Sequence, residues 1–116
     1  ELMNKKEILL KNSKILILGV AYKKDIGDTR ESPALDIIES FLGKSVDISY
    51  CDPHVDELTV NNISISREEN IENLSSYDLI LIHTPHSKFQ EINFDSVASL
   101  IFDSTGSFTI SNANRL

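Results

Sequence analysis

The segment Lys14–Ala21, KILILGVA, holds an uninterrupted apolar run followed by a glycine. Such a run with β-branched residues is typical of a strand buried on both faces. A second run of this kind, Asp78–His83 (DLILIH), ends at Thr84-Pro85. Two strands that are apolar on both faces predict a parallel sheet covered on each side.

A helix is predicted from Ser32 to Gly43. Ser32 suits the N-cap, and Pro33 suits the first helical position, where its missing N–H costs nothing. Gly43 suits the left-handed residue that ends a helix. Apolar residues recur between them at helical spacing: Ala34, Ile37, Ile38, Phe41 and Leu42.

The remaining elements are shorter, and the tail Ser104–Leu116 is polar and expected to be irregular. Strands are predicted at Val46–Cys51, Ile63–Ser66 and Leu100–Asp103, with weak helices at Glu68–Leu74 and Phe94–Leu100. Right-handed crossovers then give an α/β fold: a doubly wound, Rossmann-like parallel sheet of about five strands, with helices on both faces. The expected strand order is 3-2-1-4-5.

Composition excludes several classes of protein. The chain has 116 residues, 18 acids, 11 Lys or Arg and a net charge of −7. This acidity argues against nucleic acid and anionic membranes as partners. The longest apolar runs have four residues, as in Ile15–Leu18, whereas a membrane span needs about 20. The single cysteine excludes an internal disulfide and fits a reducing compartment.

The chain starts at Glu1 and shows no signal-peptide pattern. We therefore expect a cytoplasmic location and a piece cut from a longer protein. Residues 1–12 are expected to be the end of a connecting segment, and residues 13–116 the ligand-binding domain.

Ligands of doubly wound sheets bind beyond the carboxyl ends of the strands, at the switch point. This places Ala21–Glu31 and Thr84–Lys88 at the candidate site, with Ser104–Gly106 beside them. The dinucleotide fingerprint G-x-G-x-x-G is absent after the first strand, because Gly19 is followed by VAYKK. We therefore expect no dinucleotide pyrophosphate in that turn.

The loop Ala21–Glu31 instead offers cations. Lys23, Lys24 and Arg30 suit phosphate groups, and the Tyr22 ring could pack on a base or sugar. A ligand bearing a diphosphate fits this chemistry. The same loop carries the acids Asp25, Asp28 and Glu31, so the residues alone leave open a merely solvated loop.

The stretch Gly19–Glu39, GVAYKKDIGDTRESPALDIIE, decides between these alternatives. Together with Tyr50-Cys51-Asp52-Pro53 and Asp78–Phe89, it resembles the C-terminal, UDP-binding domain of the UDP-glucose/GDP-mannose dehydrogenase family. The form of the first motif is most similar to the enzymes that oxidise UDP-N-acetylhexosamines. The likeness covers about Lys14 to Asp103.

The resemblance implies an NAD-dependent enzyme that oxidises the C6 alcohol of a UDP-sugar to a carboxylate with two NAD+, for polysaccharide precursors. It implies that Tyr22 and Lys23 bind the substrate and that Arg30 reaches NAD, which an absent N-terminal domain would mainly hold. The partners would be that domain and a central, dimerising domain, in a homodimer or larger assembly. Lys24, Asp25, Asp28 and Glu31 are expected to brace the loop.

One position departs from the family. Members commonly carry an arginine in an Asp-x-Arg pattern after the last strand, whereas this chain has Asp103-Ser104-Thr105. Lys24, Lys88 or a residue of the missing domains could substitute, the substrate could differ, or the alignment could slip.

Cys51 and the histidines are not expected to be catalytic. The family's catalytic cysteine belongs to the middle domain, so no catalytic residue is expected in this chain, and Cys51 is expected to be a buried apolar side chain. His54 is separated from His83 and His86 by the first strand, so the spacing between strands makes them start about 10 Å apart. Long side chains could narrow this distance, but no shared metal is expected. His86 could line the cleft, but capping or solvation is the favoured expectation.

Two alternatives to an enzyme domain remain. A stand-alone, non-catalytic nucleotide-sugar-binding module fits the missing arginine. A phosphoacceptor receiver has a similar length and strand order, but no aspartate closes the third strand here and no lysine follows the fifth.

Overall fold

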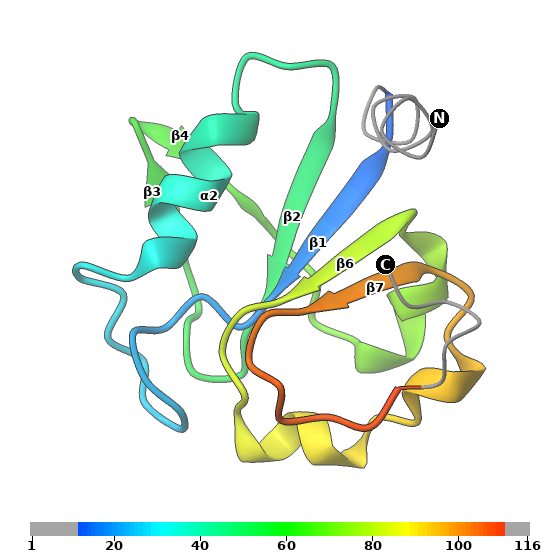
Figure 1. The fold of residues 1–116 in the computed structure, drawn as a ribbon. Helices are drawn as coiled ribbons and strands as arrows, with labels where there is room; N and C mark the ends of the chain where they lie inside the picture. Colours follow the sequence, from blue (N-terminus) through cyan, green and yellow to red (C-terminus); the bar gives the residue numbers. More distant parts are fainter. Residues whose placement is uncertain (1–11, 111–116) are drawn as a thin grey trace.

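Five parallel strands form the predicted sheet (Figure 1). The computed structural model describes residues 12–110, so the expected connecting segment at 1–12 lies outside the described residues except for Asn12. In spatial order the strands are β5 (Ser66–Arg67), β2 (Asp47–Cys51), β1 (Lys14–Leu18), β6 (Leu79–Ile82) and β7 (Leu100–Asp103). In chain order this is 3-2-1-4-5, as predicted, with the switch point between β1 and β6.

In the observed register, the last residues of neighbouring strands pair with one another, so the carboxyl ends of the central strands are aligned across the sheet. Leu18 pairs with Cys51 on one side and with Ile82 on the other, and Ile82 pairs with Asp103. The loops that follow β1, β2, β6 and β7 therefore start at one edge of the sheet, as predicted for a ligand site.

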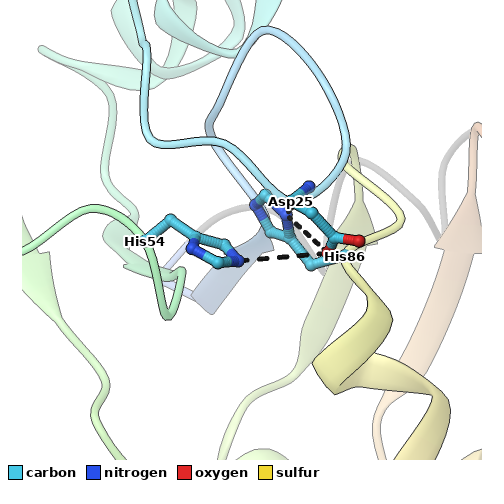
Figure 2. Close-up of side chains that lie close together, drawn as sticks. All are labelled: Asp25, His54 and His86. Carbon is cyan, nitrogen blue, oxygen red and sulfur yellow. Dashed lines mark hydrogen bonds and ion pairs between the residues drawn. The ribbon is translucent and has the colours of Figure 1, made fainter.

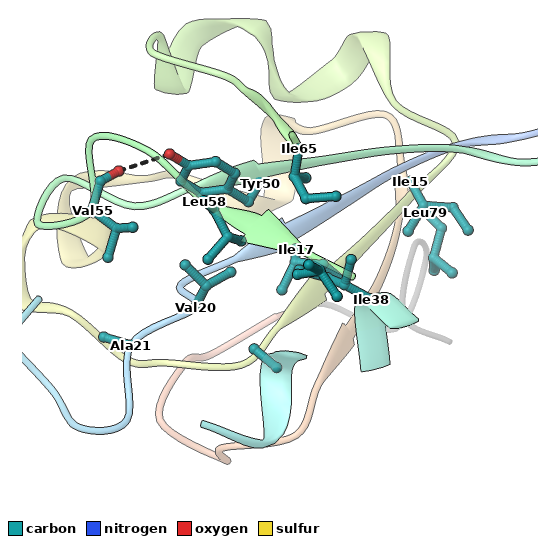
Figure 3. Close-up of a cluster of buried hydrophobic side chains, with 12 residues drawn as sticks. Ile15, Ile17, Val20, Ala21, Ile38, Tyr50, Val55, Leu58, Ile65 and Leu79 are labelled. Carbon is teal, nitrogen blue, oxygen red and sulfur yellow. Dashed lines mark hydrogen bonds between the residues drawn. The ribbon is translucent and has the colours of Figure 1, made fainter. Parts of the chain in front are cut away.

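Side chains of β1 alternate between two cores, as the two-residue period of a strand requires. Ile15 and Ile17 face the helix α2 (Pro33–Phe41), where Ile38 and Tyr50 complete a cluster of buried residues (Figure 3). Leu16 and Leu18 belong to a second cluster on the opposite face. Each fully buried aliphatic side chain contributes about 1.5–3 kcal/mol, so this central strand anchors both layers.

The helix α2 begins and ends as its sequence predicts. The Ser32 hydroxyl accepts a hydrogen bond from the backbone N–H of Ala34 at 3.2 Å, and Pro33 opens the first turn. Gly43 follows the helix with a φ of +84°, the left-handed conformation that glycine adopts most easily. The N-terminus of α2 comes directly after the loop Ala21–Glu31, which starts at the carboxyl edge of the sheet.

The opposite face carries 3-10 helices in place of the predicted α-helices. These are η1 (Ile71–Ser76), η2 (Ser87–Glu91) and η3 (Phe94–Ser96). The predicted helices at Glu68–Leu74 and Phe94–Leu100 were therefore wrong in extent and type. Asn70 and Asn93 cap η1 and η3 through their side chains, and Asn and Ser favour such short turns over longer helices.

A hairpin between β2 and β5 was not predicted. The strands β3 (Thr59–Val60) and β4 (Ile63–Ser64) pair in antiparallel fashion through Asn61 and Asn62, whose φ angles are 51° and 64°. Two positive φ angles are typical of a type I′ turn, for which asparagine is suited. The strand predicted at Ile63–Ser66 was therefore wrong in extent, since only Ser66 of that segment joins the main sheet.

No helix or strand follows β7 in the described part of the expected irregular tail. Phe108 nevertheless packs against Phe94 with ring centres 5.2 Å apart, and Ile110 is buried in the second core. Within residues 12–110, none of the helices has the length and apolar character needed to cross a bilayer.

Candidate functional site

A close backbone approach opens the candidate site. Gly19 follows β1 with a φ of +85°, and a Cβ placed there would lie 2.5 Å from the Thr84 Cβ and 2.6 Å from the Thr84 carbonyl oxygen. The Thr84 hydroxyl donates to the Ala21 carbonyl at 2.8 Å. The segments after β1 and β6 are thus in contact as soon as they leave the sheet, which requires glycine at this position.

Asp52, which follows β2, connects three strand ends. Its Oδ2 accepts hydrogen bonds from the backbone N–H groups of Val20 at 2.8 Å and Ala21 at 3.2 Å, and lies 2.8 Å from Nε2 of His86. Its Oδ1 accepts from the backbone N–H of His54 at 2.8 Å. Burial raises the pKa of the Asp52 carboxyl, but the hydrogen bonds from His86, Val20 and His54 outweigh it, and the net pKa is lowered.

Asp52 also explains the Tyr-x-Asp-Pro motif. The Tyr50 hydroxyl donates to the Val55 carbonyl at 2.9 Å and holds the turn after β2. Asp52, 1% exposed, faces inward from that turn. The motif carries the resemblance, but the structural role of Asp52 was not predicted, because Val20, Ala21 and His86 lie more than thirty residues away in the chain.

The loop after β1 folds back on itself. The backbone N–H of Tyr22 donates to the Asp28 carbonyl at 2.7 Å. The Arg30 guanidinium donates to both oxygens of the Asp28 carboxylate, at 3.1 and 3.0 Å. These bonds lower the pKa of the Asp28 carboxyl. Arg30 remains 87% exposed, so its cation lies on the surface of the loop.

Asp25 braces the same loop from its other side. Its carboxylate accepts from the backbone N–H of Ser87 at 2.7 Å and from the Ser87 hydroxyl at 2.6 Å, and these bonds lower its pKa. The expectation that Asp25 and Asp28 brace the loop is therefore confirmed. Glu31 lines a hollow beside Tyr22 instead, together with Asp28 and Arg30.

Tyr22 and Lys23 lie on the outer side of the loop. Tyr22 is 52% exposed, and the Lys23 ammonium lies 6.0 Å from the centre of its ring, at the limit of a cation–π contact. Within residues 12–110, neither Lys23 nor Lys24 forms an ion pair with a carboxylate. The carboxylates of Asp28 and Asp25 bond instead to Arg30 and Ser87, although the charge of Lys24 also helps to lower the pKa of Asp25. The Lys23 ammonium can therefore face an anion.

His54 and His86 lie closer together than predicted. Figure 2 shows Asp25, His54 and His86 side by side, although they come from the segments after β1, β2 and β6. The rings of His54 and His86 have centres 4.7 Å apart. The starting distance of about 10 Å given by the spacing between strands is narrowed to less than half. The loops bend together over the end of β1, which the strand spacing does not show.

This trio has a spacing that a metal ion could use. One ligand atom from each of Asp25, His54 and His86 lies within 4.8 Å of the others. Both nitrogens of His86 already have partners, however, since Nδ1 lies 2.8 Å from the backbone nitrogen of Asp25 and Nε2 lies 2.8 Å from Asp52. A metal would have to displace the Asp25 amide, so the expectation of no metal site stays a prediction.

His86 itself is neither solvated nor a side-chain cap. It is 0% exposed and occupies the residue before η2 without a capping bond from its ring. His83 lies apart from the trio: its Nδ1 is 3.0 Å from the Thr84 hydroxyl, and burial lowers its pKa. His86 is the N-cap residue of η2 by position, so the expected capping is confirmed for the place of the residue but not for its ring. The expected solvation was wrong, because the Asp52 carboxylate offers the ring a buried acceptor.

Cys51 is buried at the end of β2, as expected. Burial raises the pKa of its thiol to about 12. A thiol with such a pKa is protonated at neutral pH and is a poor nucleophile.

Thr105 takes part in a local turn. Its hydroxyl and its backbone N–H both donate to Oδ1 of Asp103, at 2.6 and 2.8 Å. The side chain is therefore directed to its own turn at the carboxyl edge.

A second hollow lies away from the loop after β1. It is bordered by Arg67 and Lys88 but also by four glutamates: Glu68, Glu69, Glu72 and Glu91. Such an acidic lining disfavours a phosphate-bearing ligand. The candidate site is therefore the exposed face of the loop Ala21–Glu31.

A parallel doubly wound sheet, a loop with a free ammonium group at its switch point and no glycine fingerprint together define a class of α/β ligand-binding domains. The sequence pattern of the UDP binding domain of the UDP-glucose/GDP-mannose dehydrogenase family matches residues 16–113. The chain belongs to this family, which confirms the resemblance found in the sequence.

Relatives of known activity include dehydrogenases of two UDP-sugars. A UDP-glucose 6-dehydrogenase of Rickettsia prowazekii is 34% identical over 96 residues, covering 79% of this chain and 22% of the relative. A UDP-N-acetyl-D-mannosamine dehydrogenase of Methanococcus aeolicus is 34% identical over 97 residues, covering 82% and 20%. UDP-glucose 6-dehydrogenase 1 of Glycine max is 54% identical over 46 residues, covering 40% and 10%. The chain thus spans a tenth to about a fifth of these relatives.

Solved structures show the same fold. The UDP-D-ManNAc dehydrogenase of Pyrococcus horikoshii matches with a TM-score of 0.68 and 30% identity, over 87% of this chain and 23% of that chain. The UDP-N-acetyl-mannosamine dehydrogenase of S. aureus matches with a TM-score of 0.69 and 27% identity, over 97% and 28%.

Proposed function

We propose that this chain is the UDP-sugar-binding part of an NAD-dependent UDP-sugar 6-dehydrogenase. The observation that carries the proposal is the match of residues 16–113 to a UDP binding domain. The exposed pair Tyr22 and Lys23 at the switch point of the sheet supports it, because a diphosphate needs an unpaired cation there.

Each side chain of the site has a role that follows from its chemistry. Lys23 supplies a point charge for the diphosphate, and the Tyr22 ring packs against the base or the sugar. Arg30 is exposed beside them, and its guanidinium reaches NAD held by an N-terminal domain of the same enzyme. Closing such an interface excludes water and holds the sugar C6 near the nicotinamide.

The reaction takes the C6 alcohol to a carboxylate. Two hydrides pass to two NAD+, and water supplies the second carboxylate oxygen. Among the described residues, the one thiol is the protonated Cys51, so the nucleophile must come from elsewhere in the enzyme. The chain alone is therefore expected to bind a UDP-sugar without oxidising it. In the full enzyme we place it in the cytoplasm, in a homodimer or larger assembly, supplying polysaccharide precursors.

The test is a titration of the 15N-labelled chain with UDP and with UDP-N-acetylglucosamine. Amide shifts should centre on Ala21–Glu31. Lys23→Ala should weaken binding about tenfold or more, because a charge-assisted contact is worth about 1.5–3 kcal/mol. Lys44→Ala is the matched control, since Lys44 lies next to the amino end of β2, at the opposite edge of the sheet. Shifts confined to other regions would sink the assigned site.

Thr105 favours a second candidate function, that of a stand-alone nucleotide-sugar-binding module without catalysis. The local turn of Thr105 leaves the carboxyl edge without the family's arginine. The intact mass of the native protein separates the two candidates. A mass of several domains supports the dehydrogenase, whereas a mass near the 13.0 kDa of this chain supports the module.

A further inference from the structure

The bonds of His86 fix the position of its ring proton. Its Nδ1 lies 2.8 Å from the backbone nitrogen of Asp25, and a backbone N–H can only donate, so Nδ1 accepts. In the neutral ring the proton is then on Nε2, which donates to Oδ2 of Asp52 at 2.8 Å. His86 thus connects the loop after β1 to the end of β2 through one acceptor and one donor.

A second set of hydrogen bonds joins the loop after β1 to the segment after β6, and here the loop supplies the acceptor. The Asp25 carboxylate accepts from both the backbone N–H and the hydroxyl of Ser87, the residue after His86. Asp25 therefore donates to one residue through its backbone and accepts from the next through its side chain. We call Asp25, Asp52, His86 and Ser87 the Asp25 latch.

The Asp25 latch supplies hydrogen bonds between the outer half of the loop and the segment after β6. Gly27 in the same half of the loop packs against the backbone carbonyl of His54, after β2. Tyr22 and Ile26 leave 52% and 39% of their surfaces exposed, so apolar packing contributes little there. Arg30 and Asp28 pair within the loop itself and do not tie it to the sheet. A loop with few apolar contacts opens at low free-energy cost, so its position depends on such polar bonds.

We propose that His86 is a positioning residue that holds Lys23 and Tyr22 in the arrangement that binds a UDP-sugar. The proposal rests on the proposed function of the site. Binding groups must be held to within about 0.5 Å by side chains that are themselves fixed, and buried His86 is fixed by Asp52 and by edge contact with Phe89. His86 touches no ligand in this role and acts only through Asp25.

Two substitutions separate the bonds of His86 from its volume. His86→Gln keeps one acceptor and one donor on adjacent arms of a planar group. His86→Phe keeps an aromatic ring beside Phe89 but removes both bonds. Hydrogen exchange of the amides at 22–28 should speed up about fivefold or more in His86→Phe, since one lost hydrogen bond of ordinary strength already corresponds to about fivefold. His86→Gln should restore most of the protection. UDP affinity should follow the same order.

Ser87→Ala provides a variant that keeps the fold, because Ser87 is exposed and loses only its hydroxyl bond to Asp25. It should give a smaller increase in exchange at the same amides. Ser96→Ala is its matched control, since the Ser96 hydroxyl bonds within η3, away from the loop. The 15N signals of wild-type His86 should show Nδ1 unprotonated and Nε2 protonated.

Three results would overturn the proposal: unchanged loop exchange in both His86→Phe and Ser87→Ala, equal losses of UDP affinity in His86→Phe and His86→Gln, or a proton on Nδ1 at neutral pH. Failure of the proposed function would be seen in a different measurement, the binding of UDP to the wild-type chain. In that case wild-type chain would not bind UDP, while the exchange rates, measured without ligand, would still report on the latch.

Discussion

Thr105 lies at the carboxyl edge, at the position where the sequence resemblance implies an arginine. Its hydroxyl is held by Asp103 in a turn that the backbone N–H of Thr105 also supports. The turn therefore does not depend on the hydroxyl alone. A longer side chain at this position would extend from the carboxyl edge without a change in the backbone.

Restoring the arginine should therefore strengthen binding. Thr105→Arg adds a guanidinium at the edge that carries Lys23, and a charge-assisted hydrogen bond contributes about 1.5–3 kcal/mol, or roughly 10-fold to 150-fold in affinity. Calorimetric titration of the chain with UDP measures the gain. Thr105→Gln, equally flexible but uncharged, is the control. Equal affinities of the two variants would show that no phosphate lies within reach of this position.

Single residues also show where sequence reasoning reached its limit. The bracing role of Asp28 follows from local pairing with Arg30 in the same short loop. Asp25 also braces the loop, as expected, but through Ser87 after β6, a partner that local pairing does not predict. The role of Asp52 could not be predicted, because its partners Val20 and His86 follow other strands. Only the strand register, which the sequence does not specify locally, brings these residues together.

At the scale of elements, the apolar runs gave reliable predictions and the polar segments did not. The strand β1 and the helix α2 carry strong periodic or capping signals, and both form where they were expected. The 3-10 helices η1 and η3 carry no strong periodic signal. Their asparagine caps bond to the nearby backbone, which competes with the hydrogen bonds of a longer helix. The β3–β4 hairpin had a usable signal in Asn61-Asn62, which was overlooked.

Gly19, which connects β1 to its loop, should tolerate substitution less well than the other positions of the site. Gly19→Ala combines a positive φ with contact to the Thr84 backbone, so we expect a loss of about 2–5 kcal/mol in the free energy of unfolding. Gly43→Ala is a matched control: its φ is also positive, at +84°, but no atom lies within 4 Å of the added Cβ.

Urea denaturation of the two glycine variants separates conformational strain from steric contact. The control should lose about 1–2 kcal/mol, the cost of the left-handed conformation. Similar losses in both variants would mean that the segments after β1 and β6 can move apart, and that the close approach does not constrain the site.

At the scale of the whole molecule, two cores share one sheet, and the polar network at its carboxyl edge spans both. Val20 belongs to the core under α2, whereas Phe89, three residues after His86, belongs to the core under the 3-10 helices. Asp52 bonds to both segments. The charge on this one carboxylate should therefore affect global unfolding and not only the order of a loop.

The pH dependence of unfolding tests this coupling. The pKa of Asp52 in the folded state lies below its usual value of 3.8, so the unfolded chain takes up a proton first as the pH falls. Its contribution is complete above 3.8 and is lost as the pH falls through the lower, folded value. Asp52→Asn lacks this charge and can place an amide NH2 donor against a buried N–H donor. It should therefore lower the free energy of unfolding by roughly 1–3 kcal/mol at neutral pH.

The informative quantity is the difference between wild type and Asp52→Asn, because Asp25, Asp28 and Glu68 also have lowered pKa values and remain in both proteins. That difference should be constant at neutral pH and shrink below 3.8. The exposed Glu57→Gln serves as the charge control and should show no such narrowing. A difference that stays constant into acid would mean that Asp52 acts through its shape and neutral hydrogen bonds, and that its charge does not couple the two cores.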